Sequence, residues 1–432
     1  MWARTAAKAD LVTRRVSASP GLALLLLLLL LRVTPAAASD GFADIDAHAR
    51  SAPASCATSV ESLALYLQQR TQDERERARA AFSWIAHNVA YDGSLRHENA
   101  RPEGVLAARR AACYGYAVLF EALAEAMGVE VEIVTGHGKG RGYQPGQGRD
   151  SAQDHSWNAV KTEGGWGLVD CTWGAGYFDE QGRFVQRFTD HYFLTPPEEF
   201  AYDHLPDDPK WQLLPTPISE TEYLNRVHLK SLFFERGLWL VSHRAAGIQT
   251  GSSLQVTIGA PPDTALTAAL RRDGSQLAKQ YSFTQREGDG FVVRAVFPSP
   301  GSYLLRVFAR RRAAIGEEYE TALEYAVRAL SGAGPGAGFP EVYDSFLARE
   351  CRLEYPLTRE IPAGQNVGFA LSVPRAEEVV VLGSDDEWSA LDKYGDRFSG
   401  EALTETENGK VTVFAKFPGK RRYEGLLRYT VR

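Results

Sequence analysis

The chain has 432 residues, of which 44% are hydrophobic and 11% are aromatic. This length allows two or three domains with sizeable cores, and the composition predicts a folded rather than a disordered chain. The net charge of −6 implies no basic face, so nucleic-acid binding is not expected.

The first residues have the pattern of a secretory signal peptide. Arg14 and Arg15 precede the apolar run Leu22–Leu31, and small residues follow up to Ala38. A positive segment, a short apolar core and a small-residue cleavage site are typical of signal peptides, and a core of this length is too short to span a bilayer comfortably. We expect cleavage near Ala38–Ser39 and a secreted or secretory-pathway protein, with an uncleaved membrane anchor as the alternative.

Helical patterns follow a lead-in over residues 39–58, which is rich in Ala, Ser and Asp and is expected to be poorly ordered. Apolar residues recur at helical spacing over 59–70, 73–89 and 113–127. The last of these helices begins at Cys113. There the unpaired N–H groups and the helix dipole favour a thiolate and lower the pKa of a thiol.

Strand patterns follow over 129–134, 155–161 and 166–170, and the glycine-rich segment 136–148, with Lys139 and Arg141, predicts a mobile surface loop beside the site. A tight turn at 163–165 joins the last two strands. Asp170 is then opposite His155 or one diagonal step away on the same face, about 5–8 Å between Cβ atoms. That geometry suits a carboxylate that orients an imidazole.

The cysteines, at 56, 113, 171 and 351, show no CxxC spacing, so no zinc site is expected. If Cys113 is a free nucleophile, three remain, and a bridge between Cys56 and Cys171 is possible but cannot be assigned. The acidic pair at 207–208 lacks EF-hand spacing and gives little support to a calcium-dependent reaction. No metal or other cofactor is therefore expected. His191 is interpreted as a core or interface residue, with proton transfer as the alternative.

Beyond Pro217 the chain changes to short alternating strands, as in β-sandwiches. Two internal similarities indicate two related sandwiches, on either side of a flexible Gly/Ala/Pro-rich linker at 331–338. The first similarity joins 293–298 with 413–418, and the second joins 319–328 with 423–432.

The order Cys113, His155 and Asp170, on helix, strand and strand, is more specific than any of the three residues alone. Here the sequence resembles the transglutaminase-like superfamily, and more closely its kyphoscoliosis peptidase and hillarin group. The superfamily resemblance is carried by Phe82–Asp92, Ala112–Ala117, His155–Val160 and Gly165–Asp170. The group resemblance is carried by Gly136–Gly140, Trp173–Gly176, His191–Leu194, Pro206–Trp211 and the trailing sandwiches.

The resemblance implies an α+β fold: a papain-like core, with the Cys113 helix packed on an antiparallel sheet, followed by two β-sandwich domains. The expected boundaries are a signal peptide at 1–38, the lead-in at 39–58, a catalytic domain at 59–215, a sandwich at 216–330, the linker at 331–338 and a sandwich at 339–432.

The resemblance also implies a Cys113–His155–Asp170 triad with peptidase or acyl-transfer activity on protein substrates, through a thioacyl intermediate. The Cys113 N–H is expected to bind the oxyanion, and Trp84 and Asn88 are candidates for the second donor. The alternative is a catalytically silent scaffold. In either case the sandwiches are available for protein partners or for a purely structural role, and no membrane-embedded domain is expected beyond the signal segment.

Overall fold

The computed structural model describes residues 41–95, 100–146, 148, 153–179, 181–312, 318–383, 386–404 and 409–432. The predicted signal peptide lies outside these residues. Among the helices that are described, none has the length and apolar character needed to cross a membrane.

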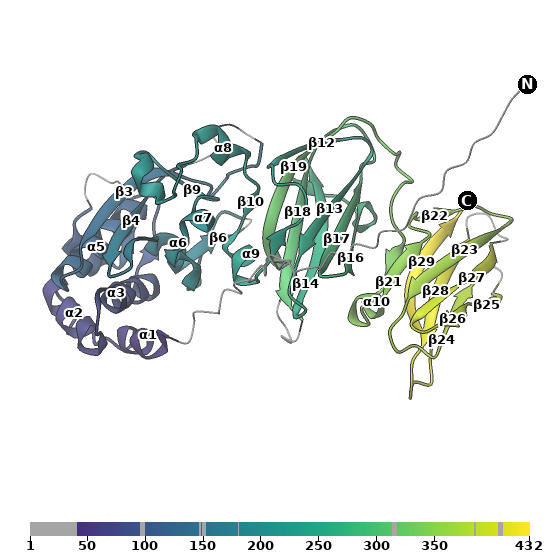
Figure 1. The fold of residues 1–432 in the computed structure, drawn as a ribbon, viewed down its shortest axis with the longest axis horizontal. Coiled ribbons are helices and arrows are strands. Elements are labelled where there is room, and N and C mark those ends of the chain that lie inside the picture. The colour runs from purple at the N-terminus through teal and green to yellow at the C-terminus, as the bar shows by residue number, and fades with distance from the viewer. Residues whose placement is uncertain are drawn as a thin grey trace, which may run out of the picture. The chain divides into compact units, whose positions relative to one another are not determined.

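The described chain begins with helices that precede and cover the first sheet (Figure 1). They are α1 (Ala43–Arg50), α2 (Val60–Leu67), α3 (Glu74–Asn88), α4 (Pro102–Ala108) and α5 (Cys113–Ala126), with the short parallel pair β1 (Ala90–Tyr91) and β2 (Arg110–Ala111) between them. Helices α2 and α3 lie within the ranges 59–70 and 73–89, where the sequence predicted helices. Ser59 and Asp73 cap them by accepting backbone N–H bonds.

Helix α1 shows that the prediction of a poorly ordered lead-in is wrong. Its buried Asp46 accepts two hydrogen bonds from Arg79 of α3, 2.7 Å from Nε and 2.6 Å from Nη2. Ile45 and Ala49 pack into the same core as α2 and α3. The pattern is weak in the sequence because α1 has few apolar residues and the partner of its carboxylate lies on another helix.

A five-stranded antiparallel sheet follows, in the order β8-β5-β4-β3-β9. Its strands are β3 (Val131–Gly138), β4 (Gln153–Thr162), β5 (Gly165–Val169), β8 (Phe193–Thr195) and β9 (His204–Pro206). Helix α5 packs on it, and Asn158 Nδ2 of β4 donates to the α5 carbonyl of Ala117 at 3.2 Å. The smaller elements around the sheet are α6 (Cys171–Ala175), β6 (Gly176–Phe178), β7 (Phe184–Gln186) and α7 (Pro197–Phe200).

The register of β4 and β5 agrees with the expected hairpin. Asn158 pairs with Val169, so Asp170 lies one diagonal step from His155 on the same face. The strand pattern therefore places the imidazole and the carboxylate together without help from distant parts of the chain.

Strand β3 lies between two histidine-bearing strands, and Gly136 makes this possible. It pairs with His155 on β4 and with Pro206 on β9, and an added Cβ would lie 2.2 Å from the Leu205 carbonyl oxygen and 2.8 Å from the Trp157 ring. Only a glycine lets both backbones approach this closely.

Gly136→Ala is expected to push β9 away from β3 and to lower the free energy of unfolding by about 1–3 kcal/mol, because the methyl group overpacks the sheet. The measurement is the denaturant midpoint. Gly104→Ala is the control, since a Cβ at this helical position meets nothing within 4 Å. Equal midpoints for Gly136→Ala and the wild type would contradict the argument.

The prediction of a mobile surface loop over 136–148 is wrong for its first part. Strand β3 continues to Gly138, and the next residue, Lys139, is only 1% exposed. Its Nζ donates to the Tyr223 carbonyl at 2.6 Å, and burial lowers the pKa of Lys139 to about 7. A lysine among glycines normally indicates a solvated turn, and its distant partner cannot be read from the local sequence.

Two β-sandwiches follow. The first has two sheets, in the orders β10-β19-β18-β14-β15 (with β12 beside β19) and β11-β13-β17-β16. Its elements are α8 (Glu220–Asn225), β10 (His228–Leu229), α9 (Ser231–Glu235), β11 (Trp239–Leu240), β12 (Gly247–Thr250), β13 (Ser253–Gly259), β14 (Thr264–Arg272), β15 (Ser275–Gln276), β16 (Ser282–Glu287), β17 (Gly290–Val296), β18 (Gly301–Arg311) and β19 (Glu320–Ala329).

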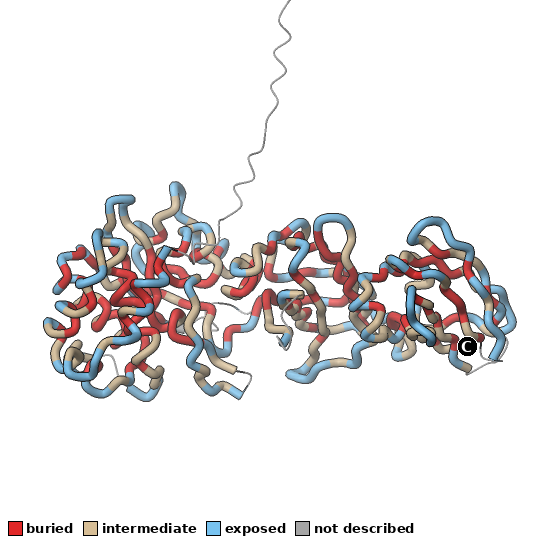
Figure 2. The backbone as a smooth tube through the Cα atoms, turned by 90° about the horizontal axis from the view of Figure 1, so that it is seen from below, coloured by how far each residue is buried: buried red, intermediate tan, exposed pale blue. Residues whose placement is uncertain are grey.

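The second sandwich has sheets in the orders β20-β29-β28-β24-β25 (with β22 beside β29) and β21-β23-β27-β26. Its elements are β20 (Glu341–Val342), α10 (Asp344–Ala348), β21 (Arg352–Tyr355), β22 (Glu360–Ile361), β23 (Gln365–Ser372), β24 (Glu378–Leu382), β25 (Trp388–Ala390), β26 (Asp392–Tyr394), β27 (Arg397–Thr404), β28 (Lys410–Lys416) and β29 (Glu424–Val431). Each sandwich has its own buried core, and Figure 2 shows these interiors in red.

The two sandwiches have corresponding strand orders, as the internal similarity predicted. Of the two pairs of similar segments, however, only one pair lies on corresponding strands. The segments 319–328 and 423–432 overlap β19 and β29, which occupy the same place in their sheets. In contrast, 293–298 lies on β17, whose counterpart is β27, whereas 413–418 lies on β28. That similarity therefore reflects an alternating strand that ends before a turn, and not a repeated position.

Candidate active site

The thiol of Cys113 is held at the first residue of α5. Ala112 precedes it in extended conformation as the N-cap, and Ala111 of β2 pairs with Tyr91 of β1. These contacts fix the start of the helix, where the first N–H groups have no partner within the helix. Cys113 is buried, with 6% of its surface exposed.

The imidazole of His155 connects this thiol to Asp170. His155 Nε2 lies 2.6 Å from Asp170 Oδ2, and the ring lies close enough to the Cys113 sulfur for each group to shift the pKa of the other. Because Nε2 is occupied by Asp170, the nitrogen that faces Cys113 is Nδ1. The structure therefore brings together the three residues that the sequence predicted, in the order sulfur, imidazole, carboxylate.

The charges of this group favour an ion pair. Burial raises the pKa of Cys113, but the hydrogen bond and charge of His155 and the N–H of Ser156 outweigh burial and lower this pKa overall. Burial also opposes protonation of His155, yet Asp170 raises the pKa of His155 to about 10. The pKa of Asp170 is lowered in spite of its burial, mainly by His155 and then by His204.

The carboxylate of Asp170 is fixed by four donors. Its Oδ1 accepts the backbone N–H groups of Thr172 at 2.8 Å and Trp173 at 3.0 Å, at the start of α6. Its Oδ2 lies 2.6 Å from His155 Nε2 and 3.0 Å from His204 Nε2. An ionised carboxylate accepts bonds only, so both imidazole nitrogens must carry protons.

Comparison with known proteins identifies the part of the chain that holds this group. Residues 61–171, which include Cys113, His155 and Asp170, match the family model of the transglutaminase-like superfamily. Residues 220–335 match the KY-like, immunoglobulin-like domain. The chain therefore contains a transglutaminase-like domain. The transglutaminase-like core followed by β-rich, Ig-like domains confirms the predicted fold class.

Relatives extend the similarity into the first sandwich. The chain is 33% identical to mouse kyphoscoliosis peptidase over 293 residues, which are 66% of this chain and 43% of that protein. It is 31% identical to Drosophila melanogaster hillarin over 313 residues, which are 65% of this chain and 38% of that protein. The chain thus spans less than half the length of these curated relatives. Among solved structures, the crystal structure of a TGase aligns with 37% of this chain and 38% of its own, at 16% identity and a TM-score of 0.20.

In the transglutaminase-like domain, aromatic rings pack against the imidazole of His155. The Trp173 ring stacks on His155 with centroids 5.2 Å apart. A Cβ at Gly138 or Gly140 would lie 3.0 Å or 3.2 Å from the Trp173 ring, so these glycines let the ring approach β3. Trp173 therefore limits rotation of His155 and excludes water from one side of it.

The two oxyanion candidates have other contacts in the transglutaminase-like domain. Trp84 is buried beneath the guanidinium of Arg109, which lies 4.3 Å from its ring. The Asn88 amide donates to the Trp84 carbonyl at 2.9 Å. A role for either in binding an oxyanion stays a prediction. His191 stacks on Phe234 at 5.1 Å, which fits its interpretation as a packing residue.

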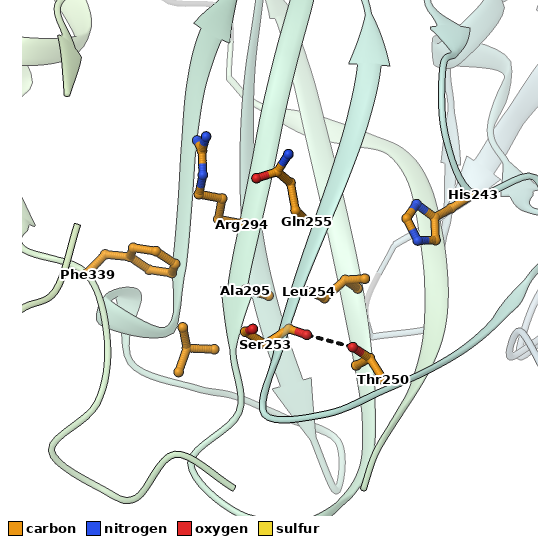
Figure 3. A pocket seen from close by; sticks show the side chains of 9 residues that line it. His243, Thr250, Ser253, Leu254, Gln255, Arg294, Ala295 and Phe339 are labelled. Carbon is orange, nitrogen blue, oxygen red and sulfur yellow. Dashed lines mark hydrogen bonds between the residues drawn. The ribbon is translucent and has the colours of Figure 1, made fainter. Parts of the chain in front are cut away.

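All four cysteines are free, so the possible Cys56–Cys171 bridge is not formed. A hollow on the first sandwich, with Gln255, Arg294 and Phe339 in its lining, contains none of the predicted site residues (Figure 3).

Sequence analysis did not identify His204, which contacts Asp170, or Asp203, which contacts His204. His204 is buried on β9, and β9 reaches the site only through its pairing with β3. The available signal was an adjacent Asp and His just before the motif at 206–211, but no local pattern links them to the hairpin of His155 and Asp170.

Alkylation by iodoacetamide at about pH 6 is expected to modify Cys113 at least about tenfold faster than Cys171 or Cys351, because each unit of pKa changes the thiolate fraction tenfold. The pKa of Cys113 is lowered, whereas burial raises the pKa of the other two. Peptide mapping by mass spectrometry measures the rates. Equal alkylation rates would contradict the ion pair.

The pH dependence of turnover provides a second check on the ion pair. The thiolate–imidazolium pair exists above the lowered pKa of Cys113 and below the pKa of His155, so turnover should fall as the pH rises through about 10.

Proposed function

We propose that the chain is a cysteine-dependent acyl-transfer enzyme, a peptidase or a transglutaminase-like enzyme, that acts on protein substrates. The observation that carries the proposal is the juxtaposition of Cys113, His155 and Asp170, with the sulfur at the N-terminus of helix α5. The superfamily is consistent with this chemistry, and the name of the mouse relative, kyphoscoliosis peptidase, describes a peptidase.

The proposed reaction begins with attack of the Cys113 thiolate on a peptide carbonyl or a glutamine carboxamide. A bond forms between sulfur and carbon, and the carbonyl oxygen becomes an oxyanion beside the first N–H groups of α5. When the C–N bond breaks, imidazolium His155 gives its proton to the leaving amine or ammonia. Asp170 keeps the ring oriented throughout.

The thioacyl enzyme is then resolved by a second nucleophile. Neutral His155 takes a proton from water or from a lysine amine, which attacks the thioester carbon and releases the Cys113 thiolate. Water gives hydrolysis and an amine gives a cross-link. The same residues serve both outcomes, and the acceptor that reaches the thioester decides between them.

Incubation with casein and a labelled primary amine, followed by mass spectrometry, tests the proposal. Amine incorporation at glutamine indicates transfer, and new peptide termini indicate proteolysis. Neither product, combined with slow alkylation of Cys113, would favour the scaffold alternative, in which the core and the sandwiches bind protein partners.

We also propose that the enzyme acts in the secretory pathway or outside the cell, on the evidence of the sequence pattern at residues 14–38. N-terminal sequencing of protein from the culture medium of expressing cells is expected to begin at or near Ser39. Retention of the whole chain inside the cells would contradict this.

A further inference from the structure

A second histidine–aspartate pair lies directly behind Asp170. His204 Nε2 is 3.0 Å from Asp170 Oδ2, and His204 Nδ1 is 2.6 Å from Asp203 Oδ1. The Tyr192 hydroxyl donates to the other Asp203 oxygen at 3.0 Å. A continuous series of hydrogen bonds therefore runs from His155 to Tyr192 and extends well beyond the proposed triad.

The protons of this pair follow from the acceptor role of Asp170. Because Asp170 is ionised and already binds two N–H groups through Oδ1, His204 must donate to Oδ2 through Nε2–H. One further proton then lies between His204 Nδ1 and Asp203. Whether it is on the ring or on the carboxyl group, the pair has zero net charge and the Nε2–H stays directed at Asp170.

The surroundings hold His204 in this one orientation. Its side chain is 0% exposed, as is that of Asp170. The ring of Phe200 stacks on the His204 ring, with centroids 3.8 Å apart. The centroid of the Trp173 ring, which also packs on His155, lies 4.3 Å from that of His204. A ring packed in this way cannot rotate to exchange its two nitrogens, so Nε2 stays beside Asp170 and Nδ1 beside Asp203. Asp203, as the partner of Nδ1, holds the ring in the Nε2–H form that the Asp170 carboxylate requires.

The contacts among His155, Asp170 and His204 fit a hydrogen-bonded series better than a metal site. His155, Asp170 and His204 each have a ligating atom within 4.8 Å of the others. However, these atoms already bond to one another at 2.6 Å and 3.0 Å, so an ion would have to displace both hydrogen bonds. Their geometry is that of a proton-linked series.

We infer that Asp203 and His204 are positioning residues of the proposed enzyme: Asp203 fixes the His204 tautomer, and His204 holds the Asp170 carboxylate in line with His155. This inference rests on the proposed function. Loss of the His204 donor leaves the negative charge of Asp170 less neutralised, and that charge raises the pKa of Cys113. The thiolate should then form only at higher pH.

The test uses three variants of the full chain and measures the alkylation rate of Cys113 by iodoacetamide as a function of pH. His204→Phe removes both ring nitrogens, and Asp203→Leu removes the group that sets the tautomer. Asp203→Asn is the matched control, because its amide can donate to Nδ1 while its oxygen accepts from Tyr192. Thermal unfolding establishes that each variant is folded.

In His204→Phe and Asp203→Leu we expect the midpoint of the pH profile of Cys113 alkylation to rise by about one pH unit. This rise would slow alkylation about tenfold at mildly acidic pH. Asp203→Asn should keep the wild-type profile. Wild-type profiles in folded His204→Phe and Asp203→Leu would overturn the inference, as would an Asp203→Asn profile displaced as far as that of Asp203→Leu. If His204→Phe does not fold, the two Asp203 variants decide the question.

The same measurement separates this inference from the proposed function. A wild-type Cys113 that alkylates no faster than Cys351 would contradict the proposed enzyme itself. Fast wild-type alkylation that is unaffected by the Asp203 and His204 substitutions would remove only the positioning roles.

Discussion

Replacing Cys113 by alanine is expected to abolish turnover, with a loss on the order of 10⁶-fold when the nucleophile of a triad is removed. The rest of the group cannot substitute, because no thioacyl intermediate forms without the sulfur. Amine incorporation into casein and the release of new termini measure the effect. The cavity left is one sulfur atom in size, so the fold should be retained.

Cys351→Ala is the matched control for this substitution. Cys351 is buried to the same degree, at 5% exposed against 6% for Cys113, but lies in the core of the second sandwich. We expect it to keep full turnover. Residual activity of Cys113→Ala at the level of Cys351→Ala would end the assignment of Cys113 as nucleophile.

Asp170→Asn is expected to lower turnover on the order of 10⁴-fold, the cost when a triad carboxylate can no longer fix the histidine tautomer. The reason here is geometric. Two N–H donors face Oδ1 and two imidazole donors face Oδ2, so an amide NH₂ on either side meets donors. Burial prevents water from relieving that conflict.

Steady-state kinetics of Asp170→Asn should show a loss mainly in kcat, since Asp170 is fully buried and is therefore not expected to contribute to substrate binding. Asp154→Asn is the control, because this neighbour of His155 has a side chain that is 90% exposed. Loss of activity in both variants to the same extent would mean that Asp170 has no special role.

Local patterns were sufficient to place Cys113 at a helix start and to pair His155 with Asp170, and the family resemblance joined Cys113 to that pair. One helix start and one short hairpin determine their positions, and both depend on residues within a few places of each other in the sequence. The helices and the alternating strands of the sandwiches were predicted for the same reason, since alternation and helical spacing report directly on which face of an element is buried. The papain-like arrangement of the core came from the family resemblance.

The parts that sequence reasoning missed all depend on distant partners. The orientation of His204 depends on β9 pairing with β3, and Lys139 is buried because its amine reaches the Tyr223 carbonyl. Helix α1 is held by the bond between Asp46 and Arg79. In each case a polar residue that would normally face solvent is buried by a contact that no short window of sequence contains.

The buried pair of Asp46 and Arg79 limits where the chain can be shortened at its N-terminal side. Processing at Ala38–Ser39 would spare Asp46, whereas a cut a few residues into α1 would remove one of the two carboxylates that neutralise the Arg79 guanidinium. Leaving such a cation without its buried partner costs about 3–5 kcal/mol. If the chain is processed as the sequence pattern predicts, the cut must therefore fall before α1, because a protease that trimmed further would destabilise the domain that carries the Cys113 thiol.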